Sequence, residues 1–161
     1  MTHIRTRLIR EDYAALSAML RSILLRLAEH RRQDTLPDFA MLRAMLFYVD
    51  EFPEKRHHRK ETELLFPKLR ARSPLSHDVL DQLDGDHVSC EKRIRDLEHA
   101  LLEFEMLGAP RRPAFENAAE SYVRFYLAHM ATEEQRVLPL AESMLTGEYL
   151  AKLDGAFSAN R

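Results

Sequence analysis

Two stretches of the chain, HHRKETELLFP at residues 57–67 and HMATEEQRVLP at residues 129–139, follow one pattern. In each, a histidine is followed four residues later by a glutamate, and a proline follows six residues after the glutamate. Side chains four residues apart project from the same face of a helix. The repeat therefore predicts two helices that each present an imidazole and a carboxylate on one face.

Apolar residues recur at steps of three and four along most of the chain, which indicates long helices rather than strands. We expect helices at about 9–30, about 38–72, from Pro74 to the break LGAPRRP at 107–113, and about 113–145. Ser73 is expected to cap the third helix, and Pro53 to kink or divide the second. Four long helices with short connections favour an all-α, up-down-up-down four-helix bundle.

The whole chain, residues 1–161, is expected to form one domain, with the bundle core at about 6–145 and a short fifth helix at about 147–158. A formal net charge of −2, spread over the sequence, gives no electrostatic case for nucleic acid or an anionic membrane as partner. No apolar run approaches the roughly 20 residues of a membrane span, and the start lacks the apolar core of a signal peptide. A single cysteine, Cys90, is compatible with a reducing compartment, so we expect a cytoplasmic protein. We also expect a monomer or a weak homodimer.

Polar residues interrupt the apolar seams of three helices. They are His57 and Glu61 on the second helix, His87 on the third, and His129 and Glu133 on the fourth. An unpaired buried carboxylate costs several kcal/mol, so such residues need partners. Imidazoles suit iron, zinc, copper and nickel, and carboxylates favour harder ions such as ferric iron. The pattern therefore predicts a transition-metal site in the core.

With HHRKETELLFP, GDHVSCE at 85–91 and HMATEEQRVLP, the chain resembles the hemerythrin-like, or HHE cation-binding, family from about Ile9 to Leu145. The resemblance implies a four-helix bundle with a non-haem di-iron centre at one end of its core. It implies a ligand set of His57, Glu61, His87, Glu91, His129 and Glu133. In the family, the glutamates at the places of Glu61 and Glu133 commonly bridge the irons.

The first helix departs from the family pattern. The family contributes a histidine where this chain reads REDYAAL at 10–16, which puts Tyr13 at that place. Tyr13 is in phase with Ile9 and Leu20, so its ring is expected in the core. It either ligates ferric iron as a phenolate or fills the space as a core tyrosine hydrogen-bonded to a neighbouring carboxylate. His58 is expected at the edge of the site, as an outer contact or a further ligand.

The expected ligands are three histidines, three carboxylates and one tyrosine, a more anionic set than the five histidines and two carboxylates of the family's oxygen carriers. Anionic oxygen ligands stabilise the ferric state. The resemblance implies two irons per chain, with or without an oxo or hydroxo bridge, and zinc or manganese as substitutes. The expected role is to sense or handle O2, NO, H2O2 or iron. A catalase-like di-iron enzyme, a passive metal store and a metal-free interaction module stay open as alternatives.

Overall fold

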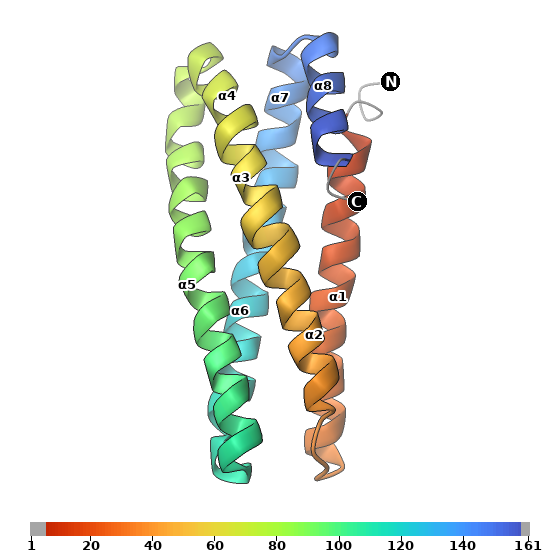
Figure 1. Ribbon diagram of the computed structural model, residues 1–161. Helices are drawn as coiled ribbons and strands as arrows, with labels where there is room; N and C mark the ends of the chain where they lie inside the picture. Colours follow the sequence, from red (N-terminus) through yellow and green to blue (C-terminus); the bar gives the residue numbers. More distant parts are fainter. Residues whose placement is uncertain (1–5, 159–161) are drawn as a thin grey trace.

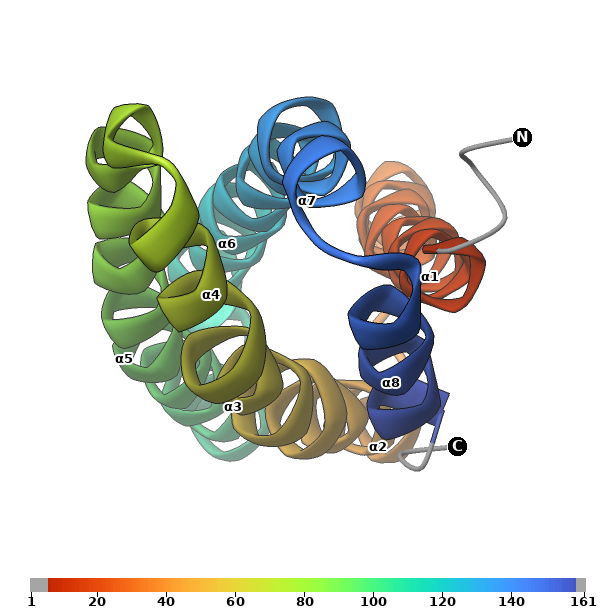
Figure 2. The same ribbon diagram turned by 90° about the horizontal axis from the view of Figure 1, so that it is seen from above.

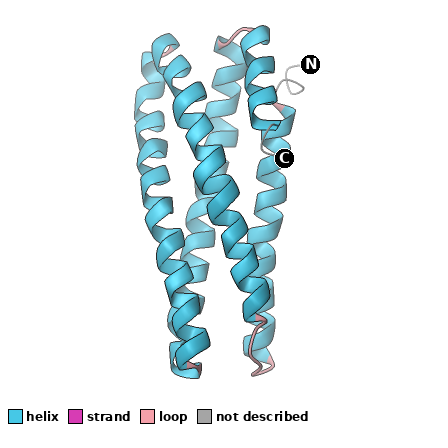
Figure 3. Cartoon of the chain, viewed as in Figure 1, coloured by secondary structure: helices cyan, strands magenta, loops and turns pink. Residues whose placement is uncertain are grey.

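The computed structural model describes residues 6–158, of which 53–55 are described by their backbone alone. Within this range almost every residue is helical and no strand forms (Figure 3). Neighbouring helical rods run in opposite directions along the molecule (Figure 1). The predicted all-α bundle is confirmed. Among the described helices, none is long and apolar enough to cross a membrane.

The first two rods are joined by a short polar loop. The first is α1 (Arg7–Arg32). The second consists of α2 (Phe39–Val49), a π-helical segment η2 (Asp50–His57), α3 (His58–Lys60), a second π-helical segment η3 (Glu61–Leu65) and α4 (Phe66–Arg72). Asp38 caps α2, because its side chain accepts a hydrogen bond from the Met41 backbone N–H at 3.0 Å.

The third and fourth rods follow, and a short helix ends the described chain. The third rod is a 3-10 turn η4 (Pro74–Ser76) and α5 (His77–Leu107). The fourth is a 3-10 turn η5 (Ala109–Arg111), α6 (Arg112–Thr132), a π-helical segment η6 (Glu133–Val137) and α7 (Leu138–Met144). The last helix is α8 (Gly147–Ser158).

Two sequence-based expectations need correction. Ser73 precedes the third rod, which opens with a 3-10 turn, but its side chain makes no capping hydrogen bond. The second rod is not divided at Pro53, since residues 39–72 are helical without a break. Pro53 instead lies within η2, where the helix widens into π geometry. The predicted domain bounds 1–161 include residues 1–5 and 159–161, which lie outside the described residues.

The two π-helical segments η3 and η6 begin at the glutamates of the repeated motif. The Phe66 N–H donates to the Glu61 carbonyl, and the Leu138 N–H donates to the Glu133 carbonyl. Both hydrogen bonds span five residues, which is the π-helical pattern. The next residue in each case is the motif's proline, which has no N–H to continue an α-helical ladder. The two copies of the motif thus share a π-helical backbone segment as well as their histidine and glutamate side chains.

The buried apolar side chains form two clusters along the bundle. The upper cluster, at the end of the molecule drawn uppermost in Figure 1, includes Leu65 and Leu83. The lower cluster includes Val49 and Cys90 and fills most of the remaining length. On the second rod, His57 and Glu61 lie between Val49 of the lower cluster and Leu65 of the upper one. On the third rod, His87 lies between Leu83 and Cys90 in the same way. A buried polar layer therefore separates the two clusters.

Candidate metal centre

Four ionisable side chains from three rods converge in this layer. They are Glu61, His87, His129 and Glu133. One possible ligand atom from each lies within 4.8 Å of the others, and each residue is at most 7% exposed. Sequence spacing predicted these four together, because each sits on the apolar seam of its rod.

Glu133 is the most heavily contacted carboxylate of the centre. Its Oε1 lies 2.6 Å from Nε2 of His129 and 3.4 Å from Nε2 of His87. Its Oε2 accepts a hydrogen bond of 2.6 Å from the Tyr13 hydroxyl. Glu133 thus joins three of the four rods through side chains that could also bind metal.

Glu61 faces the same imidazole from the opposite rod. Its Oε2 lies 3.6 Å from Nε2 of His87, and its Oε1 is in close contact with Nε2 of His57. The Tyr13 ring packs edge-on against His57, with ring centroids 5.3 Å apart. His57 and Tyr13 therefore border the four-residue cluster on the side of α1.

Two histidines are oriented by polar contacts on the outer side of their rings. Nδ1–H of His129 donates to Oδ2 of Asp86 at 3.1 Å. Nδ1 of His87 lies 3.2 Å from the Thr62 hydroxyl. Because the outer nitrogen of each ring is engaged, Nε2 is directed at the carboxylates, which is the arrangement that metal-binding histidines commonly show.

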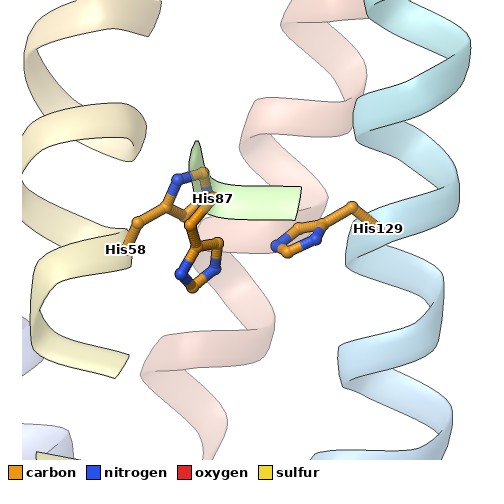
Figure 4. Close-up of side chains that lie close together, drawn as sticks. All are labelled: His58, His87 and His129. Atoms are coloured by element: carbon orange, nitrogen blue, oxygen red, sulfur yellow. The ribbon is translucent and has the colours of Figure 1, made fainter. Parts of the chain in front are cut away.

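A second group of possible ligands overlaps the first. His58, His87 and His129 each offer a nitrogen within 4.8 Å of the others, and Figure 4 shows the three rings gathered from α3, α5 and α6. His58 stacks on His87 with centroids 4.1 Å apart and planes 9° apart. Nε2 of His58 lies 2.7 Å from the Tyr126 hydroxyl. His58 is thus buried inside the layer, between His87 of α5 and Tyr126 of α6.

The two central carboxylates differ in charge when no metal is bound. Burial and the neighbouring Glu133 raise the pKa of Glu61 well above its usual value. Burial acts in the same direction on Glu133, but the charge of His129 and the close polar contacts with Glu61, His129 and His87 outweigh it, and the pKa of Glu133 falls. Burial likewise opposes the charging of His129, yet Glu133 and Asp86 raise its pKa to about 9.

Three further buried groups of the layer, His57, His58 and Tyr13, are held neutral. Burial lowers the pKa of His57 to about 4 and also lowers the pKa of His58. Burial, together with the charges of Glu133 and Glu61, raises the pKa of the Tyr13 phenol above its ordinary value of 10. Neutral imidazoles are the form in which histidine binds metal.

Several atoms of the layer are buried without a hydrogen bond. They are Nε2 of His57, Nε2 of His129 and both carboxylate oxygens of Glu61, whose contacts with one another lack hydrogen-bond geometry. A buried polar atom left without a hydrogen bond typically costs about 1–3 kcal/mol, so such atoms need an explanation. A cation that accepts lone pairs from imidazole and carboxylate supplies one. The donor types fit iron.

The structure brings most of the predicted ligands together but not Glu91. Glu91 is exposed on α5 and belongs to neither group of possible ligands. The buried seam of α5 steps from His87 to Cys90 and then Ile94, and Glu91 lies beside this seam on the exposed side. The ligand set that we propose therefore omits Glu91.

Sequence reasoning missed three contacts that shape the centre: Asp86, Thr62 and Tyr126. Asp86 and Thr62 lie one position beside His87 and Glu61, off the apolar seams. A polar residue directly beside a seam ligand could have suggested such a contact. The contact itself depends on how the neighbouring rods pack, which the sequence alone does not specify.

Comparison with known families gives one match. Residues 6–141 match the family model described as hemerythrin HHE cation binding domain. No curated protein and no solved structure matches the chain.

Proposed function

We propose that the buried centre of this chain, which belongs to the hemerythrin HHE cation-binding domain family, holds a pair of non-haem irons. The proposed role is to sense or handle O2, NO, H2O2 or iron itself. The observation that carries the proposal is the cluster of Glu61, His87, His129 and Glu133, four buried donors within 4.8 Å of one another. Together with the family, this cluster identifies a cation-binding protein.

The proposed ligands exceed what one ion can use. Seven side chains are candidates: Tyr13, His57, His58, Glu61, His87, His129 and Glu133. One metal in a six-coordinate site cannot bind them all, which favours two ions. Glu61 and Glu133 are the proposed bridges, because both contact His87 while each also contacts a further histidine, His57 or His129.

The contacts suggest that the two metal positions differ. Tyr13, His57 and Glu61 would supply one oxygen-rich position, whereas His87, His129 and His58 would supply an imidazole-rich one. With the Tyr126 hydroxyl at Nε2 of His58, that residue would ligate through Nδ1. Bound iron would supply one-electron redox chemistry toward a small oxidant.

The residues around the ions would perform two tasks. Asp86 and Thr62 orient two imidazoles, and the flanking apolar clusters exclude bulk water. A low-dielectric surrounding strengthens each of these contacts.

Peroxide disproportionation is the second candidate function. It is favoured by the oxygen donors Tyr13, Glu61 and Glu133, which would stabilise a ferric resting state. A metal-free interaction module fits less well, because it would leave the buried carboxylate oxygens of Glu61 without hydrogen bonds. Zinc or manganese would be substitutes that the same donors could bind.

The experiment is anaerobic reconstitution with ferrous iron, followed by elemental analysis, visible spectroscopy and exposure to O2, NO or H2O2. We expect about two irons per chain, as in other carboxylate-rich bundle centres. Glu61→Ala and Glu133→Ala should each lose the pair while circular dichroism retains most of the helicity. Glu91→Ala serves as the matched control and should bind iron as the parent does. Two tightly bound irons in either core variant contradict the bridging assignment, and an iron-free parent contradicts the function.

A further inference from the structure

The last described helix lies beyond the part of the chain that matches the family and packs against the metal end of the bundle. The match ends at residue 141, and α8 spans Gly147–Ser158. Seen from above, α8 stands between α1 and the second rod, where those two rods diverge (Figure 2). It therefore adds a wall at the end of the molecule that contains the polar layer.

Polar contacts attach α8 to both neighbours. The Leu8 N–H of α1 donates to Oδ1 of Asp154 at 3.2 Å. On the second rod, the Tyr149 hydroxyl donates to the Leu64 carbonyl at 2.7 Å, and Nζ of Lys60 donates to the Ala156 carbonyl. These contacts hold the two ends of α8 across the gap.

Apolar contacts place one ring of α8 on the candidate centre. Leu150 and Leu153 are buried in the upper cluster. Phe157, which is 1% exposed, belongs to the lower cluster and packs on His57, with ring centroids 4.8 Å apart and planes at 64°. Thus α8 spans the polar layer and meets it at a proposed ligand.

The contact matters because the proposed ligands are not equally shielded from solvent. Glu61, His129 and Glu133 are at most 2% exposed, whereas His57 retains 9% and His87 retains 7%. Solvent thus approaches the centre most closely at these two histidines, and His57 is the one that contacts α8. The Phe157 ring covers part of that approach and offers no polar atom to a passing solute.

We infer that α8 is the outer wall of the metal centre and that Phe157 restricts access to small uncharged molecules such as O2, NO and H2O2. The inference rests on the proposed function, since it names the class of molecule that reaches the proposed irons. An apolar ring hinders hydrated or charged solutes because they would lose water without a compensating contact.

The test compares Phe157→Ala, which removes the ring, with Phe157→Leu, which retains apolar bulk, in the full chain. The iron-loaded proteins are challenged anaerobically with a bulky anionic ferrous chelator, and the rate of iron loss is measured. Loss of a buried aromatic ring leaves a cavity, so we expect release from Phe157→Ala to be about tenfold faster than from the parent. Release from Phe157→Leu should stay near the parent rate.

A second readout needs no metal and separates this inference from the proposed function. In the metal-free proteins, diethyl pyrocarbonate modification of His57 is followed by mass spectrometry. We expect faster modification of His57 in Phe157→Ala and an unchanged rate at His77, which is exposed at the start of α5. If the parent binds no iron, the proposed function fails, but His57 still reports whether α8 is a wall.

The outcomes are distinct. The inference is overturned if Phe157→Ala releases iron and allows modification of His57 at the parent rates. This holds even if amide hydrogen exchange shows that α8 is less stable in the variant. Equal acceleration in the Ala and Leu variants overturns the role of the ring as a filter. Acceleration in Phe157→Ala alone supports it.

Discussion

Tyr13 lies at the place where the resemblance to the family predicts a histidine, and its hydroxyl donates to Oε2 of Glu133 at 2.6 Å. This hydrogen bond matches one of the two roles expected from the sequence, whereas ligation to ferric iron stays a prediction. Tyr13→Phe deletes the hydroxyl and little volume. In the metal-free protein we expect it to lower the free energy of unfolding by about 1–3 kcal/mol, because a buried carboxylate oxygen loses its donor. Urea unfolding monitored by circular dichroism measures the change.

The same variant tests ligation in the iron-loaded protein. A phenolate on ferric iron gives a visible charge-transfer band, which Phe cannot supply, so the ferric parent should be purple or blue-violet and Tyr13→Phe should not. Tyr13→His is the complementary variant and should make the ferrous state easier to hold. Identical visible spectra for the ferric parent and the Phe variant would restrict Tyr13 to its hydrogen bond with Glu133.

Asp86 orients His129 through the 3.1 Å contact at Nδ1, although the sequence analysis assigned it no role. Asp86→Asn keeps the shape but removes the charge and leaves the ring tautomer unspecified. Loss of such an outer partner typically lowers metal affinity by about 10- to 100-fold. Competition with a chelator measures the affinity, and Glu91→Gln on the same helix is the control. If Glu91→Gln weakens iron binding as much as Asp86→Asn does, Glu91 contributes to iron binding and the proposed ligand set is wrong to omit it.

Single residues were predictable where the apolar seam alone decides their direction. His57, Glu61, His87, His129 and Glu133 lie on seams, and the structure gathers them in one layer. Glu91 shows the limit of spacing, because the buried face of α5 passes from His87 through Cys90 to Ile94 and leaves Glu91 beside it and exposed. Off-seam partners such as Asp86 depend on how neighbouring rods are rotated, which one sequence does not specify.

At the scale of elements, the repeated proline accompanies the π-helical segments η3 and η6, whose first residues are Glu61 and Glu133. Pro67→Ala restores an N–H, so the rod can return to an α-helical hydrogen-bond register and rotate Glu61 relative to the other ligands. We expect retained helicity and an iron affinity lower by about tenfold, given how sensitive such centres are to ligand placement. Chelator competition measures it.

Pro113→Ala is the matched control for this prediction. Pro113 lies in the first turn of α6, where proline replaces no intrahelical donor, so its substitution should leave iron affinity unchanged. An unchanged affinity in Pro67→Ala would show that the π geometry is independent of the proline.

Element positions followed from periodicity, but their hydrogen-bond register did not. The rods and the short α8 lie near the expected ranges, because steps of three and four mark the buried faces. Each hydrogen bond of a π-helical segment spans one residue more than in an α-helix. Pro53 lies within such a segment, η2, and the second rod continues through it. Periodicity read over several turns cannot resolve a change of one residue.

At the scale of the whole molecule, the buried polar layer makes the stability of the metal-free protein depend on pH. The pKa of His57 is about 4 in the folded state and near 6.5 in the unfolded state. Between these values the unfolded state binds more protons, so stability falls as pH drops from 6.5 to 4, by up to roughly 3 kcal/mol. Burial of His58 acts in the same direction.

His129 makes stability fall as pH rises, which is the opposite dependence on pH to that of His57. Its folded pKa is raised to about 9, so its contribution is fully present below pH 6.5 and is lost as pH rises through 9. Glu61, whose folded pKa is raised, instead adds stability as pH falls toward 4.5, so the effect of His57 is measured as a difference between variants. In urea unfolding of the metal-free protein, the change in stability from pH 6.5 to pH 4.5 should be less favourable in the parent than in His57→Gln, whereas His77→Gln, at an exposed site, should behave as the parent does. Equal changes in the parent and in His57→Gln would contradict the lowered pKa of His57.

The same protonation states determine how metal binding depends on pH. Ordinary histidine pKa values predict that affinity falls only near pH 6 and below. In the folded chain, however, His129 holds a proton up to about pH 9, and Glu61 has a raised pKa. Because metal ligands must be deprotonated, iron must displace these protons at neutral pH, and affinity should rise with pH toward 9.

Calorimetry of ferrous iron binding at pH 7.5, in two buffers with different ionisation enthalpies, counts the protons released. We expect at least about one per chain, from His129, with a further contribution from Glu61, whose pKa is raised. Asp86→Asn should release fewer, because Asp86 helps to raise the pKa of His129 and its loss lets part of the proton leave before metal arrives. Binding without proton release at pH 7.5 would mean that His129 and Glu61 do not ligate the metal or are already deprotonated. The Asp86→Asn variant separates these two cases, since only a ligand role for His129 lowers iron affinity when its orienting carboxylate is removed.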